Sequence, residues 1–127
     1  MPFLIDTNIL IYALAGNVAA PVLARIDNAI ADRARYSVIT RMELLGWSGH
    51  TAITRHETES LPAQLNQVNF TPALVATVID IRSTISIKLP DAIIAASALT
   101  QNLPLMTRNA TDFSRIIGLM VIDPFAA

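Results

Sequence analysis

The chain has 127 residues, which is the size of one domain and enough to bury a hydrophobic core. Hydrophobic residues make up 53% and charged residues only 15%, and the formal net charge is −1. This balance favours a sheet covered on both faces, an apolar surface used for association, or both. The chain contains no cysteine, which excludes disulfides, cysteine-based zinc sites and thiol nucleophiles.

The apolar stretches are too short to predict a membrane protein. None reaches the ~18 consecutive apolar residues of a spanning helix, because charged residues such as Asp6, Lys88 and Asp91 interrupt them. The first basic residue is Arg25, so the start of the chain lacks the positive region of a secretory signal. We therefore expect a cytoplasmic protein. Without a repeat or linker, residues 1–127 are expected to form one domain.

Strands and helices are predicted to alternate along the chain. The first helix is expected to be capped by Thr7 or Asn8 and the third by Thr40, while Pro21 and Pro72 stand at first-turn positions of two others. In chain order, strands are expected at residues 3–5, 36–39, 68–70, 103–106 and 119–122, and helices at residues 9–15, 21–30, 41–45, 51–61, 72–81, 92–100 and 113–117. This alternation predicts an α/β fold with a largely parallel sheet.

Four acidic residues stand apart from those on solvated helix faces. Asp6 directly follows the first strand, and Glu43 lies in the first turns of the helix after Thr40. Asp91 begins the most apolar helix, and Asp112 follows a late strand. In a right-handed parallel α/β sheet, strand ends and the following helix starts share one edge. Four carboxylates at that edge would repel one another, and a hard divalent cation would neutralise them.

Each of these residues also has a purely structural interpretation. An aspartate near a helix start interacts favourably with the helix dipole, by about 0.3–1 kcal/mol. Asp91 and Asp112 fit that description as well as they fit a metal site. Asp6 fits it less well, because a carboxylate at the end of a hydrophobic strand needs a partner. The four residues together indicate a metal site more strongly than any one of them.

With these residues in place, the sequence resembles the PIN-domain nucleases, and among them the VapC-like toxins of type II toxin–antitoxin pairs. The resemblance spans nearly the whole chain in the expected order. Four segments carry it: residues 3–10 (FLIDTNIL), 37–45 (SVITRMELL), 89–96 (LPDAIIAA) and 107–113 (TRNATDF).

The resemblance implies a three-layer α/β/α sandwich with a mostly parallel central sheet. It also implies Mg²⁺- or Mn²⁺-dependent endoribonuclease activity, a homodimer and inhibition by a cognate antitoxin. The acidic ligands carried over are Asp6, Glu43, Asp91 and Asp112, and the polar residues that help place metal, water or phosphate are Thr7, Asn8, Thr107 and Asn109. Some relatives carry an acid where Asn109 stands, and family members differ in which carboxylate near this position, here Asp112, binds the metal.

The RNA contacts are expected from basic residues beside the ligands. Arg41 and Arg108 lie closest to them in sequence, and Arg115 and Lys88 are weaker candidates. These charges would offset the repulsion between an acidic pocket and RNA. Neither a histidine nor a lysine is placed as a general base, so the metal is expected to activate the attacking water.

Three alternatives remain open. A phospho-receiver domain normally has two adjacent acids after its first strand, and a haloacid-dehalogenase-type phosphatase has an aspartate two positions after the first. Thr7 and Asn8 occupy those places, and Arg108-Asn109 stands where the receiver has lysine. The third alternative is a PIN-like module that binds partners without catalysis. Metal binding and RNA cleavage separate it from a nuclease.

Overall fold

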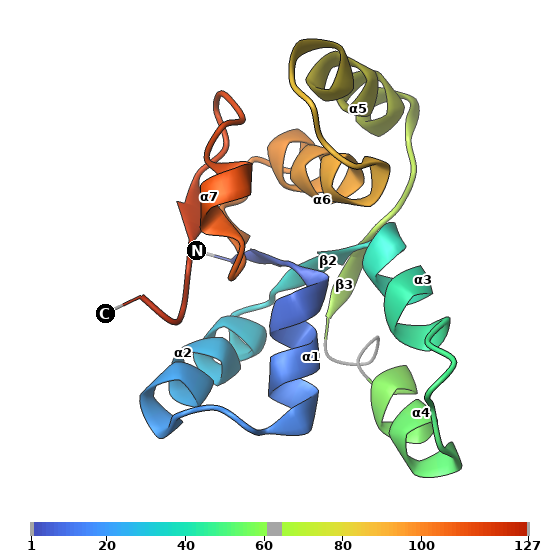
Figure 1. Ribbon diagram of the computed structural model, residues 1–127, viewed down its shortest axis with the longest axis vertical. Coiled ribbons are helices and arrows are strands. Elements are labelled where there is room, and N and C mark those ends of the chain that lie inside the picture. Colours follow the sequence, from blue (N-terminus) through green and yellow to red (C-terminus); the bar gives the residue numbers. More distant parts are fainter. Residues whose placement is uncertain (1, 61–64, 127) are drawn as a thin grey trace.

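The computed structural model describes residues 2–60 and 65–126 (Figure 1). Its strands are β1 (Leu4–Ile5), β2 (Arg35–Ser37), β3 (Asn66–Val68), β4 (Leu105–Met106) and β5 (Val121–Ile122). Its helices are α1 (Thr7–Ala15), α2 (Ala20–Ala31), α3 (Val38–Leu45), α4 (Ala52–Glu59), α5 (Pro72–Thr84), α6 (Leu89–Thr100) and α7 (Ala110–Phe113). The predicted alternation of strands and helices is confirmed.

The strands form one sheet in the order β3-β2-β1-β4-β5, and every pair of neighbours is parallel. The first strand is central: Leu4 is in register with Arg35 of β2 on one side and Leu105 of β4 on the other. All strands therefore end at the same edge, where the connections to α1, α3 and α7 begin.

Two hydrophobic clusters cover the two faces of the sheet. Successive strand residues point to opposite faces, so Leu4 packs with α5 and α6 whereas Ile5 packs with α1 and α2. Figure 1 shows the sheet nearly edge-on between these two groups of helices. The predicted three-layer α/β/α sandwich with a parallel sheet is confirmed.

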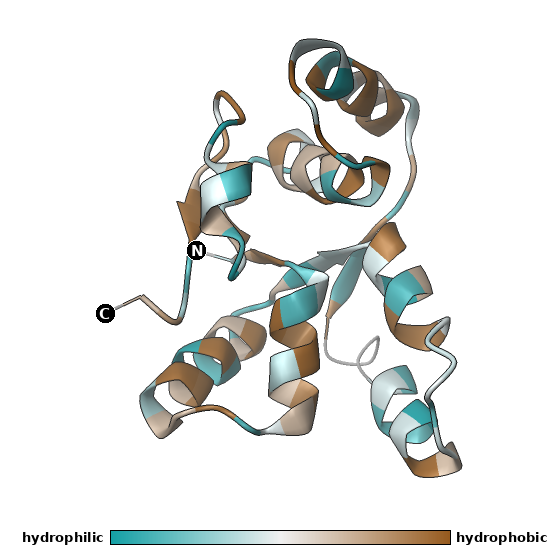
Figure 2. Cartoon of the chain, in the orientation of Figure 1, coloured by the Kyte–Doolittle hydropathy of each residue, from teal (hydrophilic) through white to brown (hydrophobic). Residues whose placement is uncertain are grey.

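The helices differ in how much of their surface is buried. Residues Ala92 to Ala98 of α6 are all buried, as its apolar sequence predicts for a central helix. The sequence of α4 is mostly polar, and Figure 2 shows this helix as predominantly hydrophilic. Among the described residues, no single helix is long and apolar enough to cross a membrane; only α1 and α2 taken together meet the length and composition criteria, and they are bent by 118°.

Two predicted helix caps were wrong. Asp6, rather than Thr7 or Asn8, caps α1, because its Oδ1 accepts a 2.8 Å hydrogen bond from the Thr7 backbone N–H. Ser37, rather than Thr40, caps α3, where its Oγ accepts from the Ile39 N–H at 3.3 Å. The strand before α3 stops at Ser37, so this helix begins three residues earlier than Thr40 would allow.

Several predicted boundaries also differ from the structure. The predicted strand at 68–70 is found at Asn66–Val68, and that at 119–122 is limited to Val121–Ile122. The helix expected at 113–117 is the short α7, because turns follow Phe113 and Gly118 has a φ of 85°. The helix expected to reach Leu61 ends at Glu59 in the structure, and Leu61 itself lies outside the described residues.

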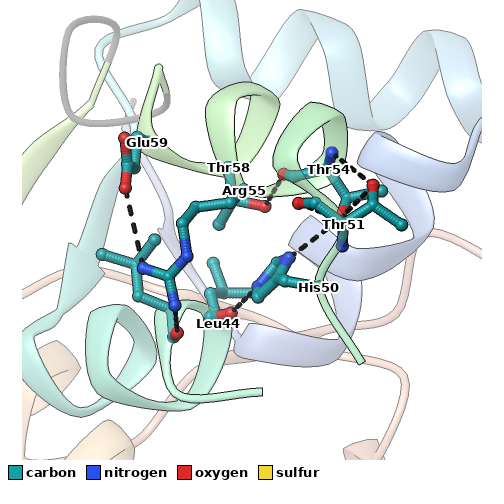
Figure 3. A network of polar contacts seen from close by, with 8 residues as sticks. Leu44, His50, Thr51, Thr54, Arg55, Thr58 and Glu59 are labelled. Atoms are coloured by element: carbon teal, nitrogen blue, oxygen red, sulfur yellow. Dashed lines mark hydrogen bonds and ion pairs between the residues drawn. The ribbon is translucent and has the colours of Figure 1, made fainter. Parts of the chain in front are cut away.

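Polar contacts join α4 to the end of α3 (Figure 3). His50 lies within hydrogen-bond distance of the Leu44 carbonyl oxygen, at 2.5 Å, and of Thr54 Oγ1, at 3.0 Å. Arg55 donates to the Leu45 carbonyl at 3.1 Å and forms an ion pair with Glu59. These bonds satisfy carbonyl groups at the end of α3 that have no partner within the helix.

Candidate active site

Asp6 is the buried carboxylate at the C-terminal edge of the sheet. Its side chain is only 5% exposed and lies between the end of β1 and the start of α1. Oδ1 accepts the capping bond from the Thr7 N–H, and Oδ2 accepts a 2.7 Å hydrogen bond from the Thr107 hydroxyl. Both carboxylate oxygens are therefore held in fixed directions by neutral donors.

The environment of Asp6 disfavours its charged form. Burial raises the pKa of Asp6 from 3.8 to about 6, although the hydrogen bonds from Thr107 and Thr7 act in the opposite direction. The negative charges of Asp91 and Glu43 raise this pKa further. A cation bound at Asp6 would remove this penalty, since it compensates both the burial and the repulsion.

Thr7 connects Asp6 to Glu43 of α3. The Thr7 hydroxyl donates a 2.7 Å hydrogen bond to Glu43 Oε1, and its oxygen lies 2.9 Å from the hydroxyl of Thr40. Because the single hydroxyl proton of Thr7 is directed to the carboxylate, Thr40 is the donor in the second bond. Thr40 is fully buried, so this chain of hydroxyl groups holds the Glu43 side chain in place from the protein interior.

Asp91 and Asp112 extend the acidic region. Asp91 lies in the first turn of α6 and is partly buried, whereas Asp112 is exposed on α7. Burial raises the pKa of Asp91; the Lys88 charge lowers it and the Asp112 charge raises it. Each of the four predicted carboxylates thus acts electrostatically on at least one of the others, with Asp6 linked to two of them.

The other predicted polar residues have different environments. Thr107 is fully buried, and its Oγ1 also accepts from the Asn109 backbone N–H at 3.0 Å. Asn109 stands at the N-cap of α7 but makes no side-chain capping bond. In the part of the chain that the structure describes, Asn8 Oδ1 is the one buried side-chain oxygen or nitrogen without a hydrogen-bond partner.

The donor set fits a hard divalent cation, but it is not a preassembled cage. The candidates are carboxylate, hydroxyl and amide oxygens, which are the ligands that Mg²⁺ prefers. Across residues 2–60 and 65–126, no three histidine or acidic side chains lie close enough together to hold a metal ion by themselves. Mg²⁺ commonly keeps several waters and takes only one or two carboxylates from the protein. A site with oxygen donors but without three closely grouped acidic side chains is therefore compatible with Mg²⁺.

The predicted basic residues differ in how available they are. Arg41 is exposed on α3, and its charge lowers the pKa of Tyr36. Arg115 is engaged with the carbonyl oxygens of Asp112 and Ser86, each at 3.2 Å. The guanidinium of Arg108 lies over the ring of Phe125, at 3.8 Å from its centroid.

Two aromatic residues beside the site were not predicted from the sequence. Tyr12 of α1 and Phe125 form an edge-to-face pair with centroids 4.9 Å apart, and both face Arg108. Tyr12 is four positions after Asn8 and therefore lies on the same face of α1. The four-residue spacing from Asn8 could have identified Tyr12 as a residue near the site. Nothing in the sequence indicates that Phe125 lies near Arg108.

The family of the chain follows from a comparison with family models. The PIN domain model matches residues 3–119, which includes all four acidic positions. The chain belongs to the PIN-domain family. This match places it among PIN domains rather than among phospho-receiver or haloacid-dehalogenase-type domains. PIN domains are typically nucleases, and they generally use divalent metal ions.

Solved structures are similar to this chain over nearly its whole length. A chain of a toxin–antitoxin complex from Klebsiella pneumoniae is 30% identical, with a TM-score of 0.77 and coverage of 98% of this chain and 99% of that one. VapBC-1 from nontypeable Haemophilus influenzae gives 27% identity, a TM-score of 0.84 and coverage of 99% and 100%.

The DNA-bound VapBC of Salmonella typhimurium is 22% identical and shares the fold, with a TM-score of 0.79 and coverage of 98% of both chains. No curated protein matches the chain. The predicted resemblance to VapC-like PIN domains is confirmed by these similarities.

Proposed function

We propose that this PIN domain is a Mg²⁺- or Mn²⁺-dependent endoribonuclease and the toxin of a toxin–antitoxin pair. One observation carries the proposal: Asp6 is a buried carboxylate whose pKa is raised by burial and by the charges of Asp91 and Glu43. Structural carboxylates are normally arranged to favour their charge, whereas this arrangement penalises it, as catalytic sites often do.

The four carboxylates would hold the metal, with Asp6 as the central ligand. Glu43 and Asp91 would complete the site directly or through waters, and Asp112, which is exposed on α7 and acts on the pKa of Asp91 rather than on that of Asp6, would contribute least. A bound Mg²⁺ or Mn²⁺ supplies neutralisation of the phosphoryl oxygens, a lower pKa for a coordinated water and stabilisation of the leaving oxygen.

The neutral residues of the site position these ligands. Thr7 orients Glu43, and Thr107 orients Asp6, each through a 2.7 Å hydrogen bond. Asn8 and Asn109 would bind water or phosphate. The unpartnered Oδ1 of Asn8 is a hydrogen-bond acceptor, so it supports a contact with water. Neither histidine is placed as a base: His50 is bonded to Leu44 and Thr54, and His56 is exposed on α4.

The RNA would be held at the edge of the acidic region by Arg41 and Arg108. Both side chains are exposed, and neither forms an ion pair with an acidic residue in the described part of the chain. Their charges therefore remain available to phosphate groups and reduce the repulsion between RNA and the carboxylates.

The surface supports two protein partners. Exposed apolar side chains lie on or beside α1, α3 and α4: Ile11, Met42, Trp47 and Ile53 are 52, 48, 58 and 72% exposed. Ile11 and Met42 lie on α1 and α3, the helices that follow β1 and β2 at the edge of the sheet where Asp6 lies. An antitoxin that binds these two helices and extends over that edge would inhibit the enzyme by covering the pocket. Ile79 and Ile117, 62 and 96% exposed on the other side of the sheet, would support a homodimer.

The test is cleavage of structured RNA with and without Mg²⁺ by the wild type and by Asp6→Asn. Asp27→Asn is a matched control, because Asp27 is exposed on α2. We expect the wild type and Asp27→Asn to cleave with metal, and Asp6→Asn to lose activity at least a hundredfold while remaining folded. Undiminished cleavage by folded Asp6→Asn, or cleavage in EDTA, would remove this mechanism. If the wild type cleaves RNA as expected, sequencing of the RNA ends that it produces would identify the target.

A PIN-like module that only binds partners is the second candidate, and the exposed apolar residues favour it equally. The same experiment separates the two. Metal binding and RNA cleavage by the wild type would exclude the binding module, whereas a folded wild type that neither binds metal nor cleaves RNA would support it.

A further inference from the structure

Arg108 is held by two aromatic residues beside the acidic region. Its guanidinium carbon lies 3.8 Å from the centroid of Phe125 and 5.5 Å from that of Tyr12. Rings on opposite sides of the guanidinium would be separated by nearly the sum of these distances, yet their centroids are only 4.9 Å apart. Both rings therefore lie on the same side of Arg108, and its other face points away from them.

The segment that carries Phe125 is itself anchored. After β5 it runs to the side of the sheet occupied by α1 and α2 (Figure 1). Asp123 Oδ1 accepts a 2.8 Å bond from the Phe125 N–H, and Arg25 of α2 donates to the carbonyl of Pro124 at 2.8 Å. Pro124 is fully buried. The ring beneath Arg108 is thus fixed by its backbone as well as by Tyr12.

The positive charge of Arg108 is not neutralised within the described residues. Arg55 is paired with Glu59, but Arg108 forms no ion pair with a described acidic residue. Its side chain is exposed, so one face rests on Phe125 while the other meets solvent. A guanidinium held flat in this way offers a stacking surface for a base and N–H groups for a phosphate at its rim.

The stack lies next to the candidate metal ligands along the chain and in space. Arg108 directly follows Thr107, whose hydroxyl bonds Asp6. Tyr12 lies on the helix that Asp6 caps, about 9 Å further along its axis. A nucleotide adjacent to a phosphate at Asp6 would reach this position.

We propose that the exposed face of Arg108, backed by Phe125 and Tyr12, is a nucleotide subsite that stacks the RNA base next to the scissile phosphate. This inference rests on the proposed function and specifies its substrate as unpaired at that nucleotide, because a base within a duplex has no free face. Phe125 and Tyr12 act as positioning residues, since they reach the base only through Arg108.

The experiment compares four variants with the wild type. Arg108→Lys keeps the charge and removes the planar surface, Phe125→Leu removes the ring, and Phe125→Tyr keeps it. Arg33→Lys is the matched control: it is the same substitution at an exposed arginine just before β2, at the opposite edge of the sheet. The readouts are the KM and kcat for RNA cleavage with Mg²⁺, and the thermal stability of each protein.

A second measurement reports stacking directly and does not require cleavage. Each variant is combined with Asp6→Asn and mixed with single-stranded RNA carrying 2-aminopurine at successive positions, whose fluorescence falls when the base is stacked. Arg108→Lys and Phe125→Leu are expected to raise KM and weaken RNA binding about tenfold, with kcat within about twofold. Both should lose the quenching at one nucleotide, and Phe125→Tyr and Arg33→Lys should retain it.

The outcomes separate this inference from the proposed function. Efficient cleavage with unchanged KM and quenching in Arg108→Lys and Phe125→Leu would overturn the subsite and leave the nuclease intact. A lower thermal stability of these variants with unchanged KM would overturn it too, because the stack would then be only structural. A wild type that binds and quenches RNA through Arg108 but cleaves none would overturn the nuclease and support the subsite.

Discussion

The hydroxyl of Thr7 donates a 2.7 Å hydrogen bond to Glu43 Oε1, although 36 positions separate the two residues in the chain. This bond joins the first turn of α1 to α3, and Thr40 supports it from the buried side. Thr7 also donates its backbone N–H to Asp6. A single threonine therefore contacts two of the four carboxylates. Substitution of Thr7 consequently tests how the uncharged residues of the site orient the carboxylates.

Replacing Thr7 by valine keeps the shape of the side chain and removes the hydroxyl. The Thr40 hydroxyl would then lose its partner in a buried position, at a cost of about 1–3 kcal/mol in the free energy of unfolding. RNA cleavage should fall at least tenfold, because Glu43 is no longer oriented. Urea unfolding and cleavage assays test both effects, with Thr77→Val as the control, because the Thr77 hydroxyl bonds to the Ala73 carbonyl within α5. Equal stabilities for the two variants would contradict the buried hydroxyl chain.

The raised pKa of Asp6 predicts a pH-dependent stability of the metal-free protein. Below pH 3.8 this group is protonated in both the folded and the unfolded states. As the pH rises toward about 6, the unfolded state releases the proton first, so the folded state loses stability. Above that range, the ionised Asp6 lowers the free energy of unfolding by its full amount, about 3 kcal/mol for a pKa shift of this size.

Asp6→Asn should remove this cost while preserving the capping bond from Thr7. We expect the variant to be more stable than the wild type at pH 7.5 by about 1–2 kcal/mol without metal, and nearly equal to it at pH 4. Urea unfolding at both pH values, in EDTA, measures the difference. A variant that is equally destabilised at the two pH values would show that Asp6 carries no such penalty.

Metal binding should reverse the cost that Asp6 imposes. Mn²⁺ at a hundred times its dissociation constant is expected to stabilise the wild type at pH 7.5 by about 2.7 kcal/mol. The effect should shrink at pH 5, where protons compete with the metal for Asp6. Thermal unfolding at both pH values, with Asp6→Asn as the comparison, measures it. An equal metal-induced shift in Asp6→Asn would place the metal elsewhere.

A pair of buried serines is predicted to fix the distance between two ligand-bearing helices. Ser97 of α6 lies 2.9 Å from Ser37, which caps α3, and both side chains are fully buried. Ser97→Ala is expected to cost about 1 kcal/mol, and Ser37→Ala about twice as much because the cap is lost as well. Urea unfolding measures both, with the exposed Ser83→Ala as the control. Additive effects in the double variant would show that the two hydroxyls do not interact.

The sequence was sufficient to predict the layers of the fold and the edge at which the acidic residues lie. Periodic apolar residues and prolines predict the helices, and a parallel sheet brings the strand ends together. Asp6 was identifiable because a carboxylate directly after a buried strand is unusual. These features depend on local patterns, which the sequence displays directly.

Caps and long-range contacts could not be predicted in the same way. Ser37 and Thr40 are both good capping residues. Ser37 caps α3 because β2 ends there, with Ser37 in register with Val68 of β3. Thr40 is then available for the hydroxyl chain that supports Glu43. The contact of Phe125 with Arg108 depends on the path of the segment after β5, which no local pattern encodes.

The bond between Thr107 and Asp6 spans 101 positions of the chain. The strand that pairs with β1 on that side, β4, is equally late in the sequence. During synthesis, Asp6 can therefore acquire neither its hydroxyl donor nor this neighbouring strand until the chain as far as Thr107 has left the ribosome. A nascent chain that ends before Thr107 would lack the finished pocket, so the topology itself delays completion of the candidate site until Thr107 has been synthesised.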